Sequence, residues 1–251
     1  MTNLLKMVQG YKEELNELYE RGWHPPALFG SLGTAVKVFE IQTLYSIVKE
    51  KKYSNILEIG TGTGFSSLYL AKALESNGHH FGTLDSVDLS KESQKRARML
   101  HHRCGIDPAF TNFICGDSTT AVPSLDREFD LCLIDGSHDY AVTKQDFLNI
   151  FPKVRPGGCV VFHDVQETIR ETTPHYVWKE ILSGELVNLG EVEIHQLDKK
   201  FHDLFSYKSD LHEIQRLQDK WRTKSWIGDN VDPCTAMALV FKKENEKKAI
   251  K

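Results

Sequence analysis

The chain contains 251 residues, of which 40% are hydrophobic and 26% are charged, and it has a formal net charge of −4 and a sequence pI near 6.3. This composition is typical of a globular protein and excludes the strongly basic surface that a dedicated nucleic-acid binder needs. No apolar run has the length of a signal-peptide core or a membrane span. We therefore expect a cytoplasmic protein with neither a membrane nor a nucleic acid as its partner.

The first 54 residues predict two helices. An amphipathic helix is expected over Leu4–Tyr19. The sequence Trp23-His-Pro-Pro then breaks the helical pattern, because proline removes a backbone donor and clashes with the preceding turn. A loop follows, and a second helix is expected over Val36–Lys49. This segment is therefore expected to be a helical cap on the domain that follows it.

Residues 55–64, Asn-Ile-Leu-Glu-Ile-Gly-Thr-Gly-Thr-Gly, predict a short strand and a glycine turn that opens a helix. This arrangement brings backbone amides and a helix N-terminus close to a ligand. Gly60 and Gly62 allow a tight turn, and Gly64 allows the helix and the strand to approach each other. Glu58 ends the strand, where it can meet a cationic or hydroxyl-bearing group and would repel the pyrophosphate of a dinucleotide.

Acidic residues also follow the next strands. A strand over 81–87 ends at Asp88, and Ser90 is placed to cap a helix over Lys91–Arg103. An acid in this position can bond a ribose diol, and Asp85 is the competing candidate for that contact.

The third and fourth strands are expected over 110–115 and 129–134. Asp117 follows the third strand, where it is either a ligand contact or a turn residue or helix cap. Asp135 and His138 follow the fourth strand. The fourth strand is a short continuous apolar run, as expected when helices cover both faces of a parallel sheet.

A fifth strand is expected over 158–162, after a turn at 155–158, and it runs into His163 and Asp164. In an open parallel sheet, ligands bind at the carboxyl ends of the strands near the point where the strand order reverses. We therefore expect one edge of the sheet to carry the functional side chains, which are Glu58, Asp88, Asp117, Asp135, His138, His163 and Asp164.

The pattern Glu-x-Gly-x-Gly-x-Gly, which begins at Glu58, resembles motif I of the class I S-adenosylmethionine-dependent methyltransferases. The resemblance implies an α/β fold, namely a Rossmann-like, doubly wound, seven-stranded sheet of order 3-2-1-4-5-7-6, with the last strand antiparallel and helices on both faces. It implies S-adenosyl-L-methionine as the cofactor, with Asp117 or Ser118 beside the adenine amino group. The implied cofactor contacts are Glu58, Gly60, Thr61, Gly62, Gly64, Asp88, Asp117, Ser118 and Asp135.

The segments LIDGSHDY (133–140) and PGGCVVFHD (156–164) resemble the metal-dependent sugar O-methyltransferases of antibiotic biosynthesis, with catechol O-methyltransferases as more distant relatives. This resemblance implies a divalent metal, Mg²⁺ or Mn²⁺, held by Asp135, His163 and Asp164. His163 departs from the pattern, because the sugar enzymes usually have a carboxylate there. Two carboxylates alone suit a Mg²⁺ that keeps several waters, whereas an added imidazole favours Mn²⁺, Fe²⁺ or Zn²⁺.

His138 corresponds to a histidine that some of these relatives use as general base, and we expect His138 and Asp135 to be the catalytic residues. Other roles for His138 are open. It can cap the helix that starts near Tyr140, bond a neighbouring acid, or ligate the metal itself.

The whole chain, 1–251, is expected to form one methyltransferase domain. The relatives suggest that the N-terminal segment closes over the cofactor, although plain packing on the sheet is equally open, and that two copies pair as a homodimer. In the insert, His202, Asp203 and Trp226 either touch substrate or are structural. The expected parts are an N-terminal helical cap (1–54), a cofactor-binding core (55–200), a lid or substrate insert (201–232), and the last strand and tail (233–251).

The sequence therefore predicts an S-adenosylmethionine-dependent methyltransferase that acts on a small-molecule hydroxyl with the help of a divalent metal. A metal-independent enzyme of the same fold, acting on a carboxylate or nitrogen, is one alternative. A non-catalytic S-adenosylmethionine-binding protein is another. A nicotinamide-dependent oxidoreductase is disfavoured, because the dinucleotide fingerprint places its third glycine three residues after the second.

Overall fold

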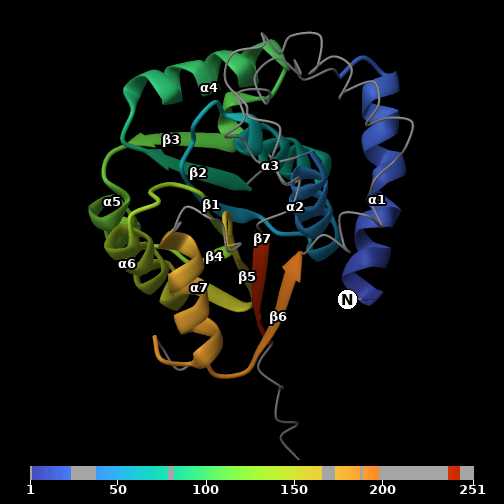
Figure 1. The fold of residues 1–251 in the computed structure, drawn as a ribbon. Coiled ribbons are helices and arrows are strands. Elements are labelled where there is room, and N and C mark those ends of the chain that lie inside the picture. Colours follow the sequence, from blue (N-terminus) through green and yellow to red (C-terminus); the bar gives the residue numbers. More distant parts are fainter. Residues whose placement is uncertain are drawn as a thin grey trace, which may run out of the picture.

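A computed structural model describes residues 2–23, 38–78, 82–165, 173–186, 189–197 and 237–243. Within them a seven-stranded sheet has the order β3-β2-β1-β4-β5-β7-β6, which confirms the predicted topology (Figure 1). The strands are β1 (Asn55–Ile59), β2 (Thr83–Asp88), β3 (Thr111–Cys115), β4 (Phe129–Ile134), β5 (Val154–Phe162), β6 (Val192–Leu197) and β7 (Met237–Lys242).

The first five strands are parallel to one another, and β7 runs antiparallel to both β5 and β6, as predicted. Their carboxyl ends are level, because Ile59 pairs with Val87 and with Ile134, and Ile134 pairs with Phe162. The chain moves outward from β1 to β3 and then returns to β4 on the other side of β1. This reversal places the switch point between β1 and β4, where ligands of such sheets bind.

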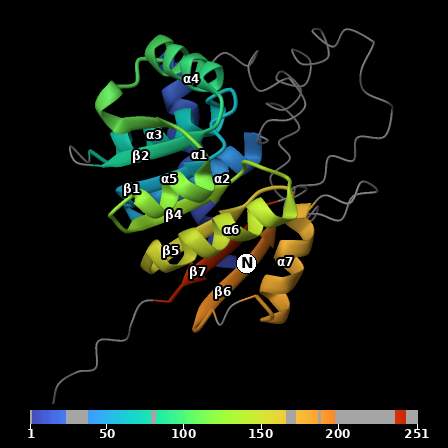
Figure 2. The ribbon, with the colours of Figure 1, turned by 90° about the vertical axis from the view of Figure 1, so that its left-hand side faces the viewer.

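Helices cover both faces of the sheet (Figures 1 and 2). Successive residues of β4 point to opposite faces, so Leu131 and Leu133 join one buried cluster with α1, α2 and α3, while Cys132 and Ile134 join another with α6 and α7. A strand that is buried on both faces must be largely apolar, which explains the apolar run Leu131–Ile134 after the paired Asp130. The helices are α1 (Thr2–Glu20), α2 (Val38–Lys51), α3 (Phe65–Ser76), α4 (Lys91–Arg103), α5 (Ser118–Ser124), α6 (Tyr140–Ile150) and α7 (Thr173–Ser183).

The N-terminal segment packs on the core, as one of its two expected roles requires. Leu4 and Leu15 of α1 are buried in the same cluster as Leu44 and Val48 of α2. The 24–37 link lies outside the described residues. So does the whole 201–232 insert, with His202, Asp203 and Trp226, and the lid expected there stays a prediction.

The predicted start of β5 was wrong. The strand begins at Val154 rather than Gly158, and the expected turn becomes a bulge, because the register with β4 shifts between Phe129 and Leu131. The ion pair from Arg155 Nε to Asp130 Oδ1, 2.6 Å long, holds this irregular segment against β4.

Other boundaries agree closely with the sequence. The helix over Lys91–Arg103 has the predicted ends, and Ser90 caps it by accepting a hydrogen bond from the backbone N–H of Ser93 at 3.1 Å. In the described part of the chain, no helix combines the length and the apolar character that a membrane crossing requires.

Candidate active site at the carboxyl edge of the sheet

The glycine turn after β1 is forced by close packing. A Cβ at Gly60, whose φ is +95°, would lie 2.0 Å from the backbone oxygen of Asp135. A Cβ at Gly64 would lie 2.5 Å from the Cβ of Ala97, so this glycine admits helix α4 rather than strand β1, contrary to the prediction. Gly62, by contrast, has no atom within 4 Å of its would-be Cβ. The turn is therefore tight against the protein at two positions and open at the third.

Glu58 meets hydroxyl groups, as its sequence context suggested, but they belong to its own chain. Its carboxyl is fully buried and hydrogen-bonded to the Ser66 hydroxyl at 2.5 Å and to the Ser86 hydroxyl. Burial raises the pKa of Glu58 to about 8, despite these two hydrogen bonds. Thr61 extends the network, with its hydroxyl 2.6 Å from that of Ser86. A direct cofactor contact by Glu58 stays a prediction.

Asp88 and its competitor Asp85 have different environments. The Asp88 carboxylate accepts hydrogen bonds from the backbone N–H of Gly62 at 2.9 Å and of Ser90 at 2.7 Å, at the edge of the sheet. Asp85 is buried within β2 and forms an ion pair with Arg127. A ribose diol can therefore reach Asp88, whereas the carboxylate of Asp85 is already engaged inside the protein.

Asp117 caps helix α5. Its carboxylate accepts hydrogen bonds from the backbone N–H of Thr119 at 2.9 Å and from the Thr119 hydroxyl at 2.7 Å, which lower the pKa of Asp117. Ser118, the first residue of this helix, is nearly buried. The backbone N–H of Gly116 donates to the backbone oxygen of Asp88 at 3.0 Å, so this turn lies beside the expected ribose contact. The capping role is confirmed, and the adenine contact stays a prediction.

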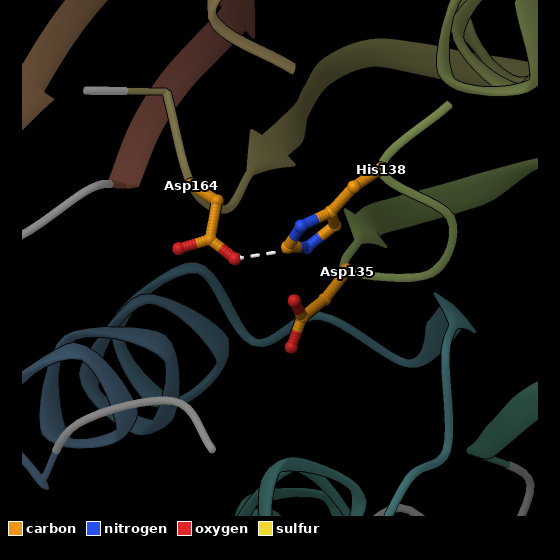
Figure 3. Close-up of side chains that lie close together, drawn as sticks. All are labelled: Asp135, His138 and Asp164. Carbon is orange, nitrogen blue, oxygen red and sulfur yellow. Dashed lines mark ion pairs between the residues drawn. The ribbon is translucent and has the colours of Figure 1, made fainter. Parts of the chain in front are cut away.

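Three side chains from the segments that directly follow β4 and β5 converge on one point (Figure 3). Asp135, His138 and Asp164 each offer one ligand atom, and these atoms lie within 4.8 Å of one another. The Nε2 of His138 is 3.1 Å from Oδ2 of Asp164. The exposed fractions of the side chains are 15% for Asp135, 34% for Asp164 and 53% for His138, so the cluster is reached from outside.

The backbone at this point is unusual. Asp164 has φ of +56°, which places a non-glycine residue in the left-handed region. Such conformations cost free energy and are found preferentially at functional sites. Burial would raise the pKa of the Asp164 carboxyl, but hydrogen bonding to His138 and the nearby positive charges outweigh burial and hold this pKa well below its usual range.

His138 does not cap helix α6. Asp139 does so, because its carboxylate accepts hydrogen bonds from the backbone N–H of Ala141 at 2.9 Å and of Val142 at 3.1 Å. The capping alternative for His138 was therefore wrong, and its contact with a neighbouring acid is confirmed. The hydrogen bond to Asp164 raises the pKa of His138.

His163 lies behind this cluster and connects it to helix α2. Its Nδ1 is 3.1 Å from Oδ1 of Asp135 and 3.2 Å from Oδ2 of Asp164, and its Nε2 is 3.1 Å from Oε2 of Glu40. Burial disfavours the charged imidazole, but the negative charges of Asp135 and Glu40 prevail and raise the pKa of His163. The sequence reasoning missed Glu40. The available signal was an acid in the apolar stripe that Leu44 and Val48 continue.

The donor set fits a divalent metal. Ligands that are neighbours around an ion at 2.0–2.2 Å lie about 3 Å apart, and both Nδ1 contacts of His163 have this length. The same Nδ1 is buried and has no aligned hydrogen-bond partner, which leaves it free for a ligand. Asp135 and Asp164 can therefore hold a metal together with His163, as predicted, or with His138.

The central part of the chain is similar in sequence to known methyltransferase domains. Residues 57–165 match the model of a methyltransferase domain family. A candidate O-methyltransferase from Mycobacterium sp. strain JLS is 33% identical over 109 residues, which are 43% of this chain and 47% of the relative. A similarly named protein from Mycobacteroides abscessus is also 33% identical, over 110 residues. The chain thus matches about half the length of these curated relatives.

Solved structures share the fold. The O-methyltransferase TomG from Streptomyces achromogenes, involved in tomaymycin synthesis and solved with S-adenosylmethionine, aligns with a TM-score of 0.62 at 18% identity, covering 88% of this chain and 91% of TomG. An O-methyltransferase from Bacillus cereus, solved with S-adenosylhomocysteine, aligns with a TM-score of 0.58 at 16% identity, covering 95% of this chain and 89% of the other.

Proposed function

We propose that this chain, whose residues 57–165 match a methyltransferase domain family, is a class I S-adenosylmethionine-dependent methyltransferase that transfers a methyl group from that cofactor to a hydroxyl oxygen of a small molecule, assisted by a divalent metal. The observation that carries the proposal is the convergence of Asp135, His138 and Asp164 at the carboxyl edge of the sheet, beside the glycine turn. Gly60 packs on Asp135 itself, so the expected cofactor site and the cluster are adjacent.

The cofactor half of the proposal rests on the edge formed by β1, β2 and β3. Asp88 lies at the edge with both oxygens turned toward backbone amides of loops, a place where it can also accept from a ribose diol. S-adenosylmethionine carries no phosphate, so a buried acid such as Glu58 under the glycine turn does not oppose its binding.

The acceptor half rests on β4 and β5. Methyl transfer is an in-line displacement at a sulfonium carbon, so the acceptor oxygen must be held on one line with the methyl group and must lose its proton. A metal bound here would lower the pKa of a chelated hydroxyl and fix its direction. His138 is half exposed and points at the cluster, and we assign it the proton-accepting role.

Asp135 and Asp164 supply hard oxygen ligands, and Nδ1 of His163, 3.1 Å from Asp135 and 3.2 Å from Asp164, completes the set and leaves His138 for the proton. The acceptor class that uses such a site is a vicinal diol or catechol, because two adjacent oxygens can chelate one ion.

A second candidate is a metal-independent methyltransferase of the same fold. One observation favours it: the imidazole of His163, whose pKa is raised, lies between Asp135 and Asp164 and can neutralise their charge without a metal. The acceptor would then be held by hydrogen bonds alone.

Methyl transfer from S-adenosylmethionine labelled in its methyl group distinguishes the two candidates. Purified protein is incubated with catechols, sugar vicinal diols and matched single-hydroxyl compounds, with Mg²⁺, with Mn²⁺ or with EDTA. Labelled product from the diols that EDTA abolishes and Mn²⁺ restores supports the metal-assisted reaction. Product that EDTA leaves unchanged supports the second candidate and removes the metal from the proposal.

A further inference from the structure

We infer that Glu40 of helix α2 is a positioning residue for the site, because it holds the imidazole of His163 so that Nδ1 faces the metal position between Asp135 and Asp164. The inference rests on the proposed metal-assisted function and deepens it, since it makes the N-terminal cap a structural part of the metal site rather than only a cover for the sheet.

The geometry defines the roles of the two ring nitrogens. Oε2 of Glu40 lies 3.1 Å from Nε2 of His163, on the far side of the ring from Asp135 and Asp164. A carboxylate at this distance accepts the Nε2 hydrogen, so Nδ1 is the nitrogen that would give its lone pair to a metal once the metal has displaced the Nδ1 proton. A metal-ligating histidine commonly donates its other N–H to a carboxylate, which fixes both the tautomer and the ring orientation.

Burial indicates that Glu40 has a specific task. It is 0% exposed, and the other buried residues of the helix are uncharged, being apolar or aromatic except for the hydroxyl residues Thr43 and Ser46. A carboxylate is costly to bury unless it is paired, and an apolar side chain would fill the same space without that cost. His163 is itself only 7% exposed, so the pair lies inside the protein where solvent competes little for either partner.

The contact with Glu40 fixes the orientation of Nδ1, the second nitrogen of the His163 ring. Although Nδ1 is 3.1 Å from Asp135, no hydrogen-bond partner is aligned with it. Rotation of the ring would break the contact with Glu40, so the carboxylate of α2 determines where Nδ1 points. The segments that follow β4 and β5 are thus joined to α2 at one proposed metal position, and Glu40 is 123 positions away from His163 in the chain.

Metal binding tests the inference without any turnover. The 251-residue protein and its variants are titrated calorimetrically with Mn²⁺ alone and with Mg²⁺ alone, and Co²⁺ is added to follow the visible absorption that reports nitrogen ligation. The variants are Glu40→Ala, Glu40→Gln and His163→Asn. The matched control is Glu50→Gln, on the same helix, where Glu50 is exposed and accepts a hydrogen bond from Tyr11. Affinity for S-adenosylhomocysteine and the melting temperature are measured for each protein.

We expect Glu40→Ala to weaken Mn²⁺ binding by about 10–100-fold. Mg²⁺ binding should weaken less, because Mg²⁺ gains little from an imidazole. The preference for Mn²⁺ over Mg²⁺ should therefore fall toward that of His163→Asn, and the Co²⁺ spectrum should change in the same way. Glu40→Gln keeps an acceptor and should lie between wild type and Glu40→Ala, while Glu50→Gln should match wild type.

A double-mutant comparison separates positioning from a general loss of structure. In the His163→Asn background, Glu40→Gln should have no further effect on the metal preference, because the ring that it positions is absent. Equal losses of Mn²⁺ affinity in both backgrounds, or wild-type metal preference in a folded Glu40→Gln protein, would overturn the inference while leaving the proposed function standing. If the wild-type protein binds S-adenosylhomocysteine but no metal, both the metal-assisted reaction and this role of Glu40 are wrong.

Discussion

The two halves of the carboxyl edge carry acids in the same structural position but in opposite surroundings. After β1, β2 and β3, the carboxyl groups of Glu58, Asp88 and Asp117 are each engaged by hydroxyls or backbone amides of their own chain. After β4 and β5, Asp135 and Asp164 face histidine nitrogens instead. The acids after β1, β2 and β3 therefore stabilise the chain around them, whereas those after β4 and β5 bring ionisable groups together at a single point.

An acidic residue at a strand end lies at the carboxyl edge of the sheet, but the groups that contact its carboxylate indicate its role. A carboxylate that accepts two backbone N–H bonds, as Asp88 does, stabilises the conformation of a loop and is available to a neutral hydroxyl donor. Carboxylates that converge with imidazole nitrogens, as Asp135 and Asp164 do, can hold a cation, which is the role we propose for them. Four predictions test this distinction, in order of expected effect.

Removing an acid from the proposed metal site should have the largest effect on activity. We expect Asp135→Asn and Asp164→Asn each to lower metal-stimulated methyl transfer by at least ~100-fold, because a carboxylate ligand is lost. Affinity for S-adenosylhomocysteine should stay within a few fold in Asp164→Asn. Asp107→Asn, which alters a helix cap at an exposed turn, is the control. Residual metal-stimulated turnover in both site variants would place the metal elsewhere.

Removing the imidazole of His138 should slow turnover by ~10²–10⁴-fold, the usual contribution of a general base. His195→Ala is a matched control, because His195 lies on β6 with its ring near Glu193. Rates are compared at saturating cofactor and acceptor. A loss below tenfold would show that the contact between His138 and Asp164 is structural and that another group accepts the proton.

On the cofactor half, Asp88→Ala should weaken S-adenosylhomocysteine binding by roughly 1.5–3 kcal/mol, the value of a hydrogen bond to a charged group. Metal binding should be unaffected, which would show that the cofactor contact and the proposed metal site are independent. Calorimetry measures both affinities. Unchanged cofactor affinity would move the ribose contact to another residue of the edge, but not to Asp85, whose carboxylate is paired with Arg127.

The smallest effect concerns stability and Glu58. Its pKa is about 8 in the folded protein against 4.5 ordinarily, so the folded state binds the extra proton between these values. The stability that this proton contributes is complete below pH ~4.5 and is lost as the pH rises toward 8. We expect urea unfolding of wild type to lose ~1–3 kcal/mol from pH 5 to pH 8 relative to Glu58→Gln. Equal pH slopes in the two proteins would contradict this, and Glu92→Gln, an exposed change on α4, is the control.

Much of the fold was predictable because local signals agreed with one another. Apolar runs marked the parallel strands, Ser90 marked the start of α4, and the glycine pattern marked the turn after β1. The strand order came from the family resemblance, since the periodicity of strands does not contain their order. The bulge in β5 could not be predicted, because it depends on how β5 pairs with β4, whose register with β5 shifts between Phe129 and Leu131.

The site was only partly predictable for a similar reason. Its acids and histidines stood out at strand ends, but their partners depend on contacts between distant segments. Nothing near Glu58 in sequence showed that Ser86, on another strand, would engage it. Glu40 is separated from His163 by 123 positions and gave only the weak signal of an acid in an apolar stripe.

The most direct test of the central claim is a calorimetric titration of the purified protein with S-adenosylhomocysteine, with and without Mn²⁺. We predict saturable binding of one nucleoside per chain that Asp88→Ala weakens, together with a separate Mn²⁺ signal that Asp164→Asn removes. Absence of nucleoside binding under both conditions would contradict the assignment of this edge as a methyltransferase site.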